Sequence, residues 1–370
     1  MQNIIEGIQN IITFKMPFIG RLKWAVKFYF EKMKWKLSPE FNRSQAEFDA
    51  NKVYWIDPLS IRYFTPQKSN GNSETGFILE QAMDFQKQPI ETLQNYQAKL
   101  GDRAPLSLDT LYNAQSPALD SPQDCATIHI GKHGDIILNG SNHAFFENLK
   151  DDAPMPVRIL GRHKKWVEFR NELLAYGQVY DNLTYQKVEH VDLADIPALH
   201  DSSDRFTMIK NNMQSKGGKL LDIGANLGYF SNRFEQEGFE CYAVEASPKE
   251  GYFIKKIKRA RNANFHVINK SIFSYNDLKH TSYDVVLALN IFHHFLKSCR
   301  NYVHLKKLLQ SMKMNEMFFQ PHLPDEDQMD NAYKNCTPEE FVDIIIENTC
   351  LTKATYLGKA SDGRKVYHIV

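Results

Sequence analysis

The 370-residue sequence predicts an α/β protein whose C-terminal half carries a mostly parallel sheet of seven strands. Two observations predict this fold. From residue 219 onward, short apolar runs with strand character alternate with segments of helical hydrophobic spacing, as in successive βαβ units. The first run leads into a turn that contains Gly224 and Gly228, which suits a sharp passage from strand to helix. Because the chain is longer than one ordinary domain, we expect a smaller α+β domain and a helical arm before this half.

The composition is that of a folded protein without a strong charge bias. Apolar residues make up 42% of the chain, and 45 Lys and Arg balance 44 Asp and Glu. This balance argues against a nucleic-acid coating protein, and we expect no nucleic-acid partner. The five cysteines form no CxxC pair, which suits a reducing compartment, so we expect a cytoplasmic protein. No apolar run reaches the roughly 18–20 residues of a spanning helix.

We divide the chain into an arm (residues 1–45), an accessory domain (46–180) and a C-terminal domain (181–370). Within residues 1–40 the arm holds seven Lys or Arg against three Glu, a local net charge of +4. Its apolar residues form two helical stripes: Ile4, Ile5, Ile8, Ile11 and Ile12, then Ile19, Leu22, Val26, Tyr29, Phe30, Met33 and Leu37. Such a basic amphipathic helix either packs on the protein's own core or lies on an anionic membrane. We expect contact with an anionic membrane surface, as a peripheral protein on the inner face of the cell membrane.

In the accessory domain the hydrophobic pattern predicts a small α+β unit. We expect a strand over residues 51–65, helices over 76–100, a hairpin of strands 127–130 and 136–138, a strand over 157–160 and a helix over 164–176. Polar loops are predicted over residues 66–75 and 101–124.

Part of this domain, residues 125–170, resembles the ParB/sulfiredoxin-like fold in the run DCATIHIGKHGDIILNGSNHAFFENL and the following PMPVRILGRHKKW. The paired His-Arg of that family falls at His143 and Ala144, so the arginine that would bind a phosphate is absent. We therefore expect a structural or substrate-presenting module here, with a second active site as the alternative.

The elements of the C-terminal domain follow from alternating apolar runs and helical spacing. Strands are expected over residues 219–223, 239–244, 264–268, 283–289, 316–320, 351–357 and 365–370, and helices over 227–237, 248–261, 300–312 and 337–348. The last helix begins with a capping box of Thr337 and Glu340.

The most specific pattern is the run KLLDIGANLGYFSNRFEQEGFECYAVE. Its first strand contains Asp222, its turn holds Gly224, Asn226 and Gly228, and its second strand leads to Glu245, seventeen positions after Gly228. The glycines let the backbone approach a ligand, and the glutamate can accept hydrogen bonds from both ribose hydroxyls. These features fit a dinucleotide or S-adenosylmethionine (SAM).

Two details favour SAM over a dinucleotide. Asn226 replaces the middle glycine of the G-x-G-x-x-G fingerprint, and the third glycine is absent. A pyrophosphate would lose its close backbone approach at this turn, whereas SAM has no pyrophosphate.

The motifs LLDIGANLGYFS, CYAVEAS and YDVVLALNIFHHF occur in the order found in class I SAM-dependent methyltransferases, and residues 200–370 resemble that family. DIGANLGYF is similar to FkbM-type enzymes, and NIFHHF resembles methyltransferases of bacterial polysaccharide assembly. The resemblance implies a Rossmann-like domain, SAM as cofactor and methyl transfer to an acceptor. We expect O-methylation of a glycan, a glycan-linked phosphate or another small acceptor in envelope assembly.

The resemblance also implies the site residues. Cofactor contacts are expected from Asp222, Gly224, Asn226, Gly228, Glu245, Ser271 and Asn290, where Ser271 is chosen for adenine over its neighbours Asn269 and Lys270. A histidine base suits a hydroxyl acceptor, and His293 and His294 are the catalytic candidates. Neighbouring residues of a helix point in different directions, so we expect one of the two to face the site.

Other readings stay open at this point. His293, His294, His322 and Asp325 all follow strands, but their spacing matches no metal signature and we predict no metal site. The family resemblance also permits a methyltransferase for nucleic acid or protein, or an inactive module that binds SAM.

Overall fold

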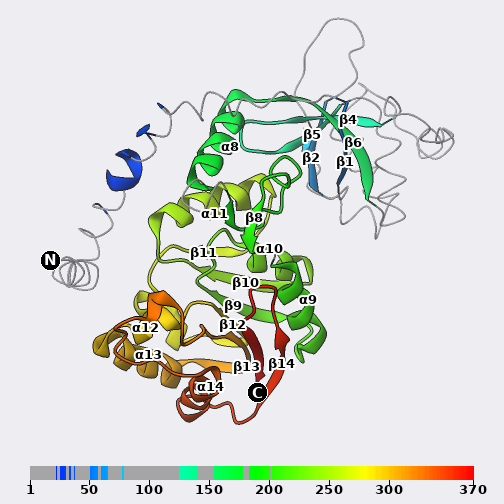
Figure 1. Ribbon diagram of the computed structural model, residues 1–370. Coiled ribbons are helices and arrows are strands. Elements are labelled where there is room, and N and C mark those ends of the chain that lie inside the picture. The colour runs from blue at the N-terminus through cyan, green and yellow to red at the C-terminus, as the bar shows by residue number, and fades with distance from the viewer. Residues whose placement is uncertain are drawn as a thin grey trace, which may run out of the picture.

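The computed structural model describes residues 51–56, 60–65, 77–78, 125–139, 154–177, 183–200 and 202–370, with residues 22, 26–30, 33, 34 and 37 of the arm. These residues form a seven-stranded sheet, a six-stranded sheet and a two-stranded pair (Figure 1). Within these ranges no helix combines the length and the apolar character needed to cross a membrane.

The large sheet confirms the predicted α/β fold. Its strands lie in the order β11-β10-β9-β12-β13-β15-β14. Their bounds are β9 Gly218–Ile223, β10 Phe239–Val244, β11 His266–Ile268, β12 Ser282–Leu289, β13 Lys313–Gln320, β14 Ala354–Lys359 and β15 Lys365–Ile369. Strands β9 to β13 pair in parallel, and β15 is antiparallel to both β13 and β14. The strand order reverses between β9 and β12, and in such sheets ligands bind at this point, outside the carboxyl ends of the strands.

Helices cover both faces of this sheet. The helices are α9 Ser203–Asn212, α10 Tyr229–Gln236, α11 Pro248–Ala260, α12 His293–Leu296, α13 Cys299–Ser311 and α14 Pro338–Glu347, with the short 3-10 helices η5 Ile272–Ser274, η6 Asn276–Lys279 and η7 Asp327–Met329. Leu220 of β9 is buried with Phe230 and Phe234 of α10 in one core. The next residue, Leu221, is buried on the other face with Leu305 of α13. Successive side chains of a strand point to opposite faces, so β9 is apolar on both.

The expected ends of two helices are confirmed. Thr337 accepts a hydrogen bond from the backbone N–H of Glu340, and the Glu340 side chain accepts one from the Thr337 N–H, which completes the capping box of α14. Gly238 follows α10 with φ of 90°, a left-handed conformation that glycine adopts readily.

The accessory domain contains a mixed sheet in the order β1-β6-β4-β5-β2-β3. The bounds are β1 Val53–Ile56, β2 Ile61–Thr65, β3 Phe77–Ile78, β4 Ala126–Ile130, β5 Ile136–Asn139 and β6 Met155–Arg162. The predicted hairpin is confirmed as β4 and β5, which pair antiparallel.

Two predictions in this domain are wrong. The single strand expected over residues 51–65 is two strands, because β1 pairs with β6 whereas β2 pairs with β5. Pro58 stands between them in the sequence, and proline interrupts a hydrogen-bonded ladder. Phe77 and Ile78, expected to be helical, pair antiparallel with β2, so sheet pairing outweighs their helical spacing. The rest of 76–100 and the two predicted loops lie outside the described residues.

Helix α8 Lys164–Gly177 joins the accessory sheet to the large domain. Its Trp166 and Tyr176 are buried in one core with Phe253 of α11. The Tyr252 hydroxyl of α11 donates to Glu172 Oε2 of α8 at 2.7 Å. The two domains therefore share a continuous apolar core, and their contact is stabilised by burial as well as by hydrogen bonds.

The segment after α8 continues this core. Strands β7 Thr184–Gln186 and β8 Ala198–His200 pair in parallel, and Leu193 and Ile196 between them are buried with α8. Asp192 accepts a hydrogen bond from the indole N–H of Trp166 at 2.8 Å. Described residues on both sides of the predicted boundary at residue 181 thus pack in one core.

The described part of the arm includes helical residues 26–30. Phe28 packs on Tyr252 and Phe253 of α11, with ring centroids 5.3 and 6.3 Å apart. The described members of the second predicted stripe are 42–79% exposed: Leu22, Val26, Tyr29, Phe30, Met33 and Leu37. The arm thus touches the large domain through Phe28 and leaves this apolar stripe in solvent. The first stripe lies outside the described residues.

Candidate functional site

A cavity of about 330 Å³ lies where β9, β10 and β12 end. Six of the predicted residues line it: Asp222, Gly224, Asn226, Glu245, Asn290 and His294. Sequence analysis missed the other lining residues, which are Tyr185, Gln186, Arg205, Phe230, Ser247, Lys249, Glu250, Leu289 and Ile291. The cavity therefore forms at the position where the strand order reverses, as the topology predicts.

The glycine-rich turn packs so closely against neighbouring side chains that two of its positions have no room for a Cβ atom. Gly224 has φ of 78°, and a Cβ there would lie 2.9 Å from Cδ1 of Ile291, which also lines the cavity. Gly228 has φ of 84° and begins α10 without lining the cavity, and a Cβ there would lie 2.8 Å from Ile254. Both positions require glycine, for the backbone conformation and for the space.

Glu245 presents a buried carboxylate from the end of β10. Its Oε2 accepts the Asn226 N–H at 2.9 Å, and its Oε1 accepts the Ser247 N–H at 2.8 Å. Each oxygen retains a lone pair for a further donor. Burial, reinforced by the charge of Glu250, raises the pKa of the Glu245 carboxyl to about 7.

Asp222 is a second buried carboxyl in the same cavity. Its Oδ2 accepts a hydrogen bond from Ser231 Oγ at 2.7 Å, which ties the end of β9 to α10. Burial raises the pKa of Asp222 to about 6. Three acidic side chains line the cavity when Glu250 is included, so its acidic side favours a ligand with positive charge and hydroxyl donors.

Several polar atoms of the cavity have no partner within the described part of the chain. They are Gln186 Oε1, Arg205 Nε, Asn226 Oδ1 and Asn290 Oδ1. The other two nitrogens of the Arg205 guanidinium donate to Gln320 and Ser202, each at 3.0 Å. A buried polar atom without a partner costs about 1–3 kcal/mol, so this cluster favours a polar ligand that carries both donors and an anionic acceptor.

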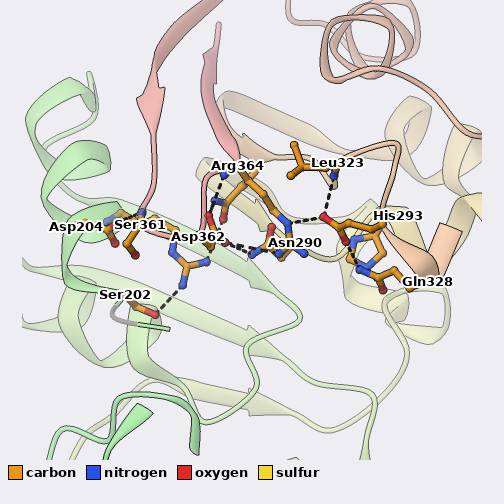
Figure 2. A network of polar contacts seen from close by, with 12 residues as sticks. Ser202, Asp204, Asn290, His293, Leu323, Gln328, Ser361, Asp362 and Arg364 are labelled. Carbon is orange, nitrogen blue, oxygen red and sulfur yellow. Dashed lines mark hydrogen bonds and ion pairs between the residues drawn. The ribbon is translucent and has the colours of Figure 1, made fainter. Parts of the chain in front are cut away.

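The two catalytic candidates, His293 and His294, occupy different positions relative to the cavity. His294 lines the cavity, whereas His293 does not and its Nε2 pairs with Gln328 Oε1 at 3.0 Å (Figure 2). Burial lowers the pKa of His294 to about 4 and that of His293 to about 3. Both rings are therefore neutral near pH 7, and His294 is a free base beside the cavity.

His322 and Ser271 lie outside the cavity lining. His322 Nε2 pairs with Asn335 Oδ1 at 2.9 Å, and Ser271 precedes η5. The side-chain N–H groups of Asn269 donate to the backbone oxygens of Glu245 and Ser247, at 2.8 and 2.9 Å. These hydrogen bonds fix the loop after β10. Among the described residues no group of three or more His, Cys, Asp or Glu is arranged to hold a metal ion.

The turn between β14 and β15 contacts residues at the ends of β12 and β13 (Figure 2). Asp362 accepts hydrogen bonds from Asn290 and from Gln320. Arg364 Nε donates to Glu326 Oε1 at 2.8 Å. The ends of β12 and β13 are thereby held by a polar network from the last hairpin of the chain.

The comparisons with known proteins agree with this geometry. Residues 200–334 match a family model described as a methyltransferase domain. This part of the chain is therefore similar to a methyltransferase domain, and the strand order of the large sheet is that of a class I methyltransferase fold. The match begins at residue 200, so it lends no support to the ParB/sulfiredoxin-like resemblance of residues 125–170. No curated protein matches the chain.

Solved structures with low similarity include the bifunctional kinase-methyltransferase WbdD, with 15% identity and a TM-score of 0.43. That alignment covers 51% of this chain and 43% of WbdD, so the chain spans less than half of that protein. A putative O-methyltransferase from Nostoc punctiforme PCC 73102 has 17% identity and a TM-score of 0.35, covering 45% of this chain and 54% of the other. The N-methyltransferase NodS from Bradyrhizobium japonicum WM9 has 11% identity and a TM-score of 0.37, covering 45% and 94%. The similarity to a methyltransferase domain therefore rests on the family match and on the order of the strands.

Proposed function

We propose that the protein is a SAM-dependent methyltransferase that acts on a hydroxyl group. The observation that carries this proposal is the buried Glu245 carboxylate above the glycine turn, in a cavity with unpartnered polar atoms. The residues fit the cofactor: Glu245 would accept the ribose hydroxyls, and Arg205 Nε would donate to the carboxylate of the methionine part. Asn226 Oδ1 and Asn290 Oδ1, which have no partner among the described residues, would accept hydrogen bonds from its amino group.

SAM supplies, when bound, a methyl group on a positively charged sulfonium. The acidic lining of Asp222 and Glu250 stabilises a cation in this cavity. His294 would accept the acceptor's hydroxyl proton at a ring nitrogen, because burial holds the ring neutral at pH 7. Leu289 and Asn290 at the end of β12 would help to orient the donor, and positioning supplies most of the catalysis in a displacement of this type.

The acceptor that we propose is a glycan or a glycan-linked phosphate of a bacterial envelope. The NIFHHF segment supports this class, and a membrane-borne acceptor agrees with the basic arm. The experiment is methyl transfer from labelled SAM to separate envelope glycan, protein and RNA fractions, with His294→Gln as the control. Label in the glycan fraction that disappears in His294→Gln supports the proposal. Label confined to RNA or protein overturns the acceptor, and donor binding without transfer to any fraction indicates a SAM-binding module.

We further propose that the arm holds this cytoplasmic protein on an anionic membrane. Phe28 faces α11, while Tyr29, Phe30 and Leu37 are exposed at 61%, 67% and 79%. Exposed apolar side chains of this size, next to the exposed Lys27 and Lys34 and within a region of net positive charge, fit a headgroup layer of opposite charge.

Flotation of the full chain with vesicles tests the arm. Vesicles that contain phosphatidylglycerol should carry the wild type, and vesicles of phosphatidylcholine alone should carry much less. The double variant Phe30→Ser with Leu37→Ser should lose flotation, whereas Val303→Ser, which removes an exposed apolar side chain of α13, should keep it. Equal flotation of all three proteins would refute membrane attachment through the arm.

A further inference from the structure

A buried tyrosine of α8 connects the accessory domain to a residue that lines the cavity. Tyr176 lies in the last turn of α8 and is fully buried. Its hydroxyl donates to Glu250 Oε1 at 3.1 Å, across the contact between the two domains. Glu250 lies in the first turn of α11 and lines the cavity.

The hydrogen bonds continue from Glu250 to the ribose-binding carboxylate. The second oxygen of Glu250 accepts the hydroxyl of Ser247, the N-cap residue of α11. The backbone N–H of Ser247 donates to Glu245 Oε1 at 2.8 Å. A continuous chain of hydrogen bonds therefore runs from Tyr176 of the accessory domain to Glu245.

We propose that Tyr176 is a positioning residue through which the accessory domain sets the donor affinity of the methyltransferase domain. Its hydroxyl fixes the Glu250 carboxylate, which holds Ser247 so that the Ser247 N–H stays directed at Glu245. The inference rests on the proposed function, because Glu245 acts there as the ribose acceptor. A network in which every member has a partner orients its groups more strongly than isolated pairs do.

The structure offers a clean variant and a matched control. Tyr176→Phe keeps the ring, which packs on Phe253 at 5.0 Å and lies 4.8 Å from Lys249 Nζ, and removes only the hydroxyl. Tyr252→Phe likewise removes one hydroxyl between α11 and α8, but that hydroxyl donates to Glu172, which does not line the cavity. The hydrogen bond lost in Tyr176→Phe belongs to the chain that ends at Glu245, whereas the one lost in Tyr252→Phe does not.

The pH dependence separates positioning from general destabilisation. Besides Glu250, the charged and titratable side chains that line the cavity are Asp222, Lys249, Arg205, His294 and Tyr185. Burial raises the pKa of Glu245, and the charges of Glu250 and Asp222 raise it further, whereas the N–H groups of Ser247 and Asn226 lower it. If Ser247 is released, the pKa of Glu245 rises further, and the pH at which donor affinity is half lost should move upward.

The experiment is calorimetric titration of the full chain with S-adenosylhomocysteine from about pH 6 to about pH 8, a range centred on the Glu245 titration. At pH 7, Tyr176→Phe should weaken binding about three- to tenfold, as for an indirect loss of one charge-assisted hydrogen bond, and should shift the pH midpoint upward. Tyr252→Phe should leave both unchanged. Equal affinities and equal midpoints in the two variants would overturn the inference.

A second measurement does not depend on the cofactor. Hydrogen exchange of the Ser247 backbone N–H should be faster in Tyr176→Phe than in Tyr252→Phe or in the wild type. Unchanged exchange at Ser247 in Tyr176→Phe would refute the inference even if donor binding is weakened. Absence of binding in the wild type with faster exchange in Tyr176→Phe would instead refute the proposed function and leave the hydrogen-bond chain intact.

Discussion

The side-chain N–H of Asn290 donates to Asp362 Oδ2 at 3.1 Å, which ties the end of β12 to the turn of the last hairpin (Figure 2). The other oxygen of Asp362 accepts the Gln320 side-chain N–H at 3.0 Å. This contact orients the Asn290 amide, whose Oδ1 remains without a partner in the cavity. A residue far along the chain thereby sets the direction of a side chain that lines the cavity.

Replacing Asp362 should destabilise the fold and weaken the site together. In Asp362→Ala the buried N–H groups of Asn290 and Gln320 lose their acceptor, and the free energy of unfolding should fall by about 1–3 kcal/mol. Urea denaturation measures this change. The control is Asp325→Ala, an exposed aspartate, which should change stability by less than about 0.5 kcal/mol. Equal losses in the two variants would contradict the role of Asp362.

Donor affinity should rise with pH around neutrality. The pKa of Glu245 is raised by burial, and then by Glu250, from 4.5 to about 7, and its ionised form is the better acceptor for ribose hydroxyls and the better partner for a cation. The dissociation constant of SAM should therefore fall as pH rises through about 7. Titration calorimetry of the wild type and of Glu245→Gln checks this. The variant, whose side chain at this position cannot ionise, should lose the dependence of the dissociation constant on pH. The same pH dependence in both proteins would contradict the role of the Glu245 carboxylate.

The raised pKa of Glu245 should also make the free energy of unfolding depend on pH, and this free energy should fall where donor affinity rises. Because the pKa of Glu245 in the folded state lies above its ordinary value of 4.5, the folded protein favours the protonated carboxyl. The contribution of this group to the free energy of unfolding is largest below about pH 4.5 and is lost as pH rises through about 7. In denaturation without ligand, Glu245→Gln should therefore gain stability relative to the wild type as pH rises from about 5 to about 8. A stability difference that stays constant with pH would refute this assignment.

The two neighbouring histidines should behave differently. His294→Gln should lower kcat by about 100-fold or more and leave the dissociation constant of the donor nearly unchanged, as for the loss of a general base. His293→Gln should leave kcat within a few fold, because the ring lies outside the cavity and pairs with Gln328. Steady-state kinetics with the acceptor tests both. A larger loss in His293→Gln than in His294→Gln would reverse the assignment.

The glycine turn offers a matched pair of variants. Gly224 and Gly238 both have positive φ, of 78° and 90°, so alanine at either should cost about 1–2 kcal/mol of stability from backbone strain. A Cβ at Gly224 would also meet Ile291 in the cavity, whereas a Cβ at Gly238 meets nothing. Gly224→Ala should therefore weaken SAM binding at least tenfold, and Gly238→Ala should leave the affinity for SAM unchanged. Titration calorimetry measures both affinities. If both variants bind SAM with wild-type affinity, the turn does not contact the ligand.

Sequence reasoning predicted those parts of the site that lie within one local unit. Gly224, Asn226 and Glu245 belong to consecutive elements whose order and spacing determine their meeting. The sequence did not predict Arg205 and Tyr185 as lining residues, because α9 and β7 bring them to the cavity by tertiary packing. No local sequence pattern identifies a buried arginine in the first turn of a helix.

The fold shows the same division between local and tertiary information. From residue 218 onward the seven strands and the helices α10, α11, α13 and α14 agree with the prediction within a few residues, since each has its own apolar period. The short helix α12 and the 3-10 helices were not predicted. The accessory sheet was predicted less completely, because β1 and β2 pair with β6 and β5 rather than with each other. Phe77 and Ile78 likewise depend on a partner strand for their conformation.

Titration of SAM into the wild type and into Glu245→Ala is the most direct test of the central claim. The wild type should bind, and the variant should bind about 10- to 150-fold more weakly, which corresponds to the roughly 1.5–3 kcal/mol of a charged hydrogen-bond acceptor. A wild type that does not bind SAM, or a variant that binds it equally well, would contradict the assignment of this cavity as the methyl-donor site.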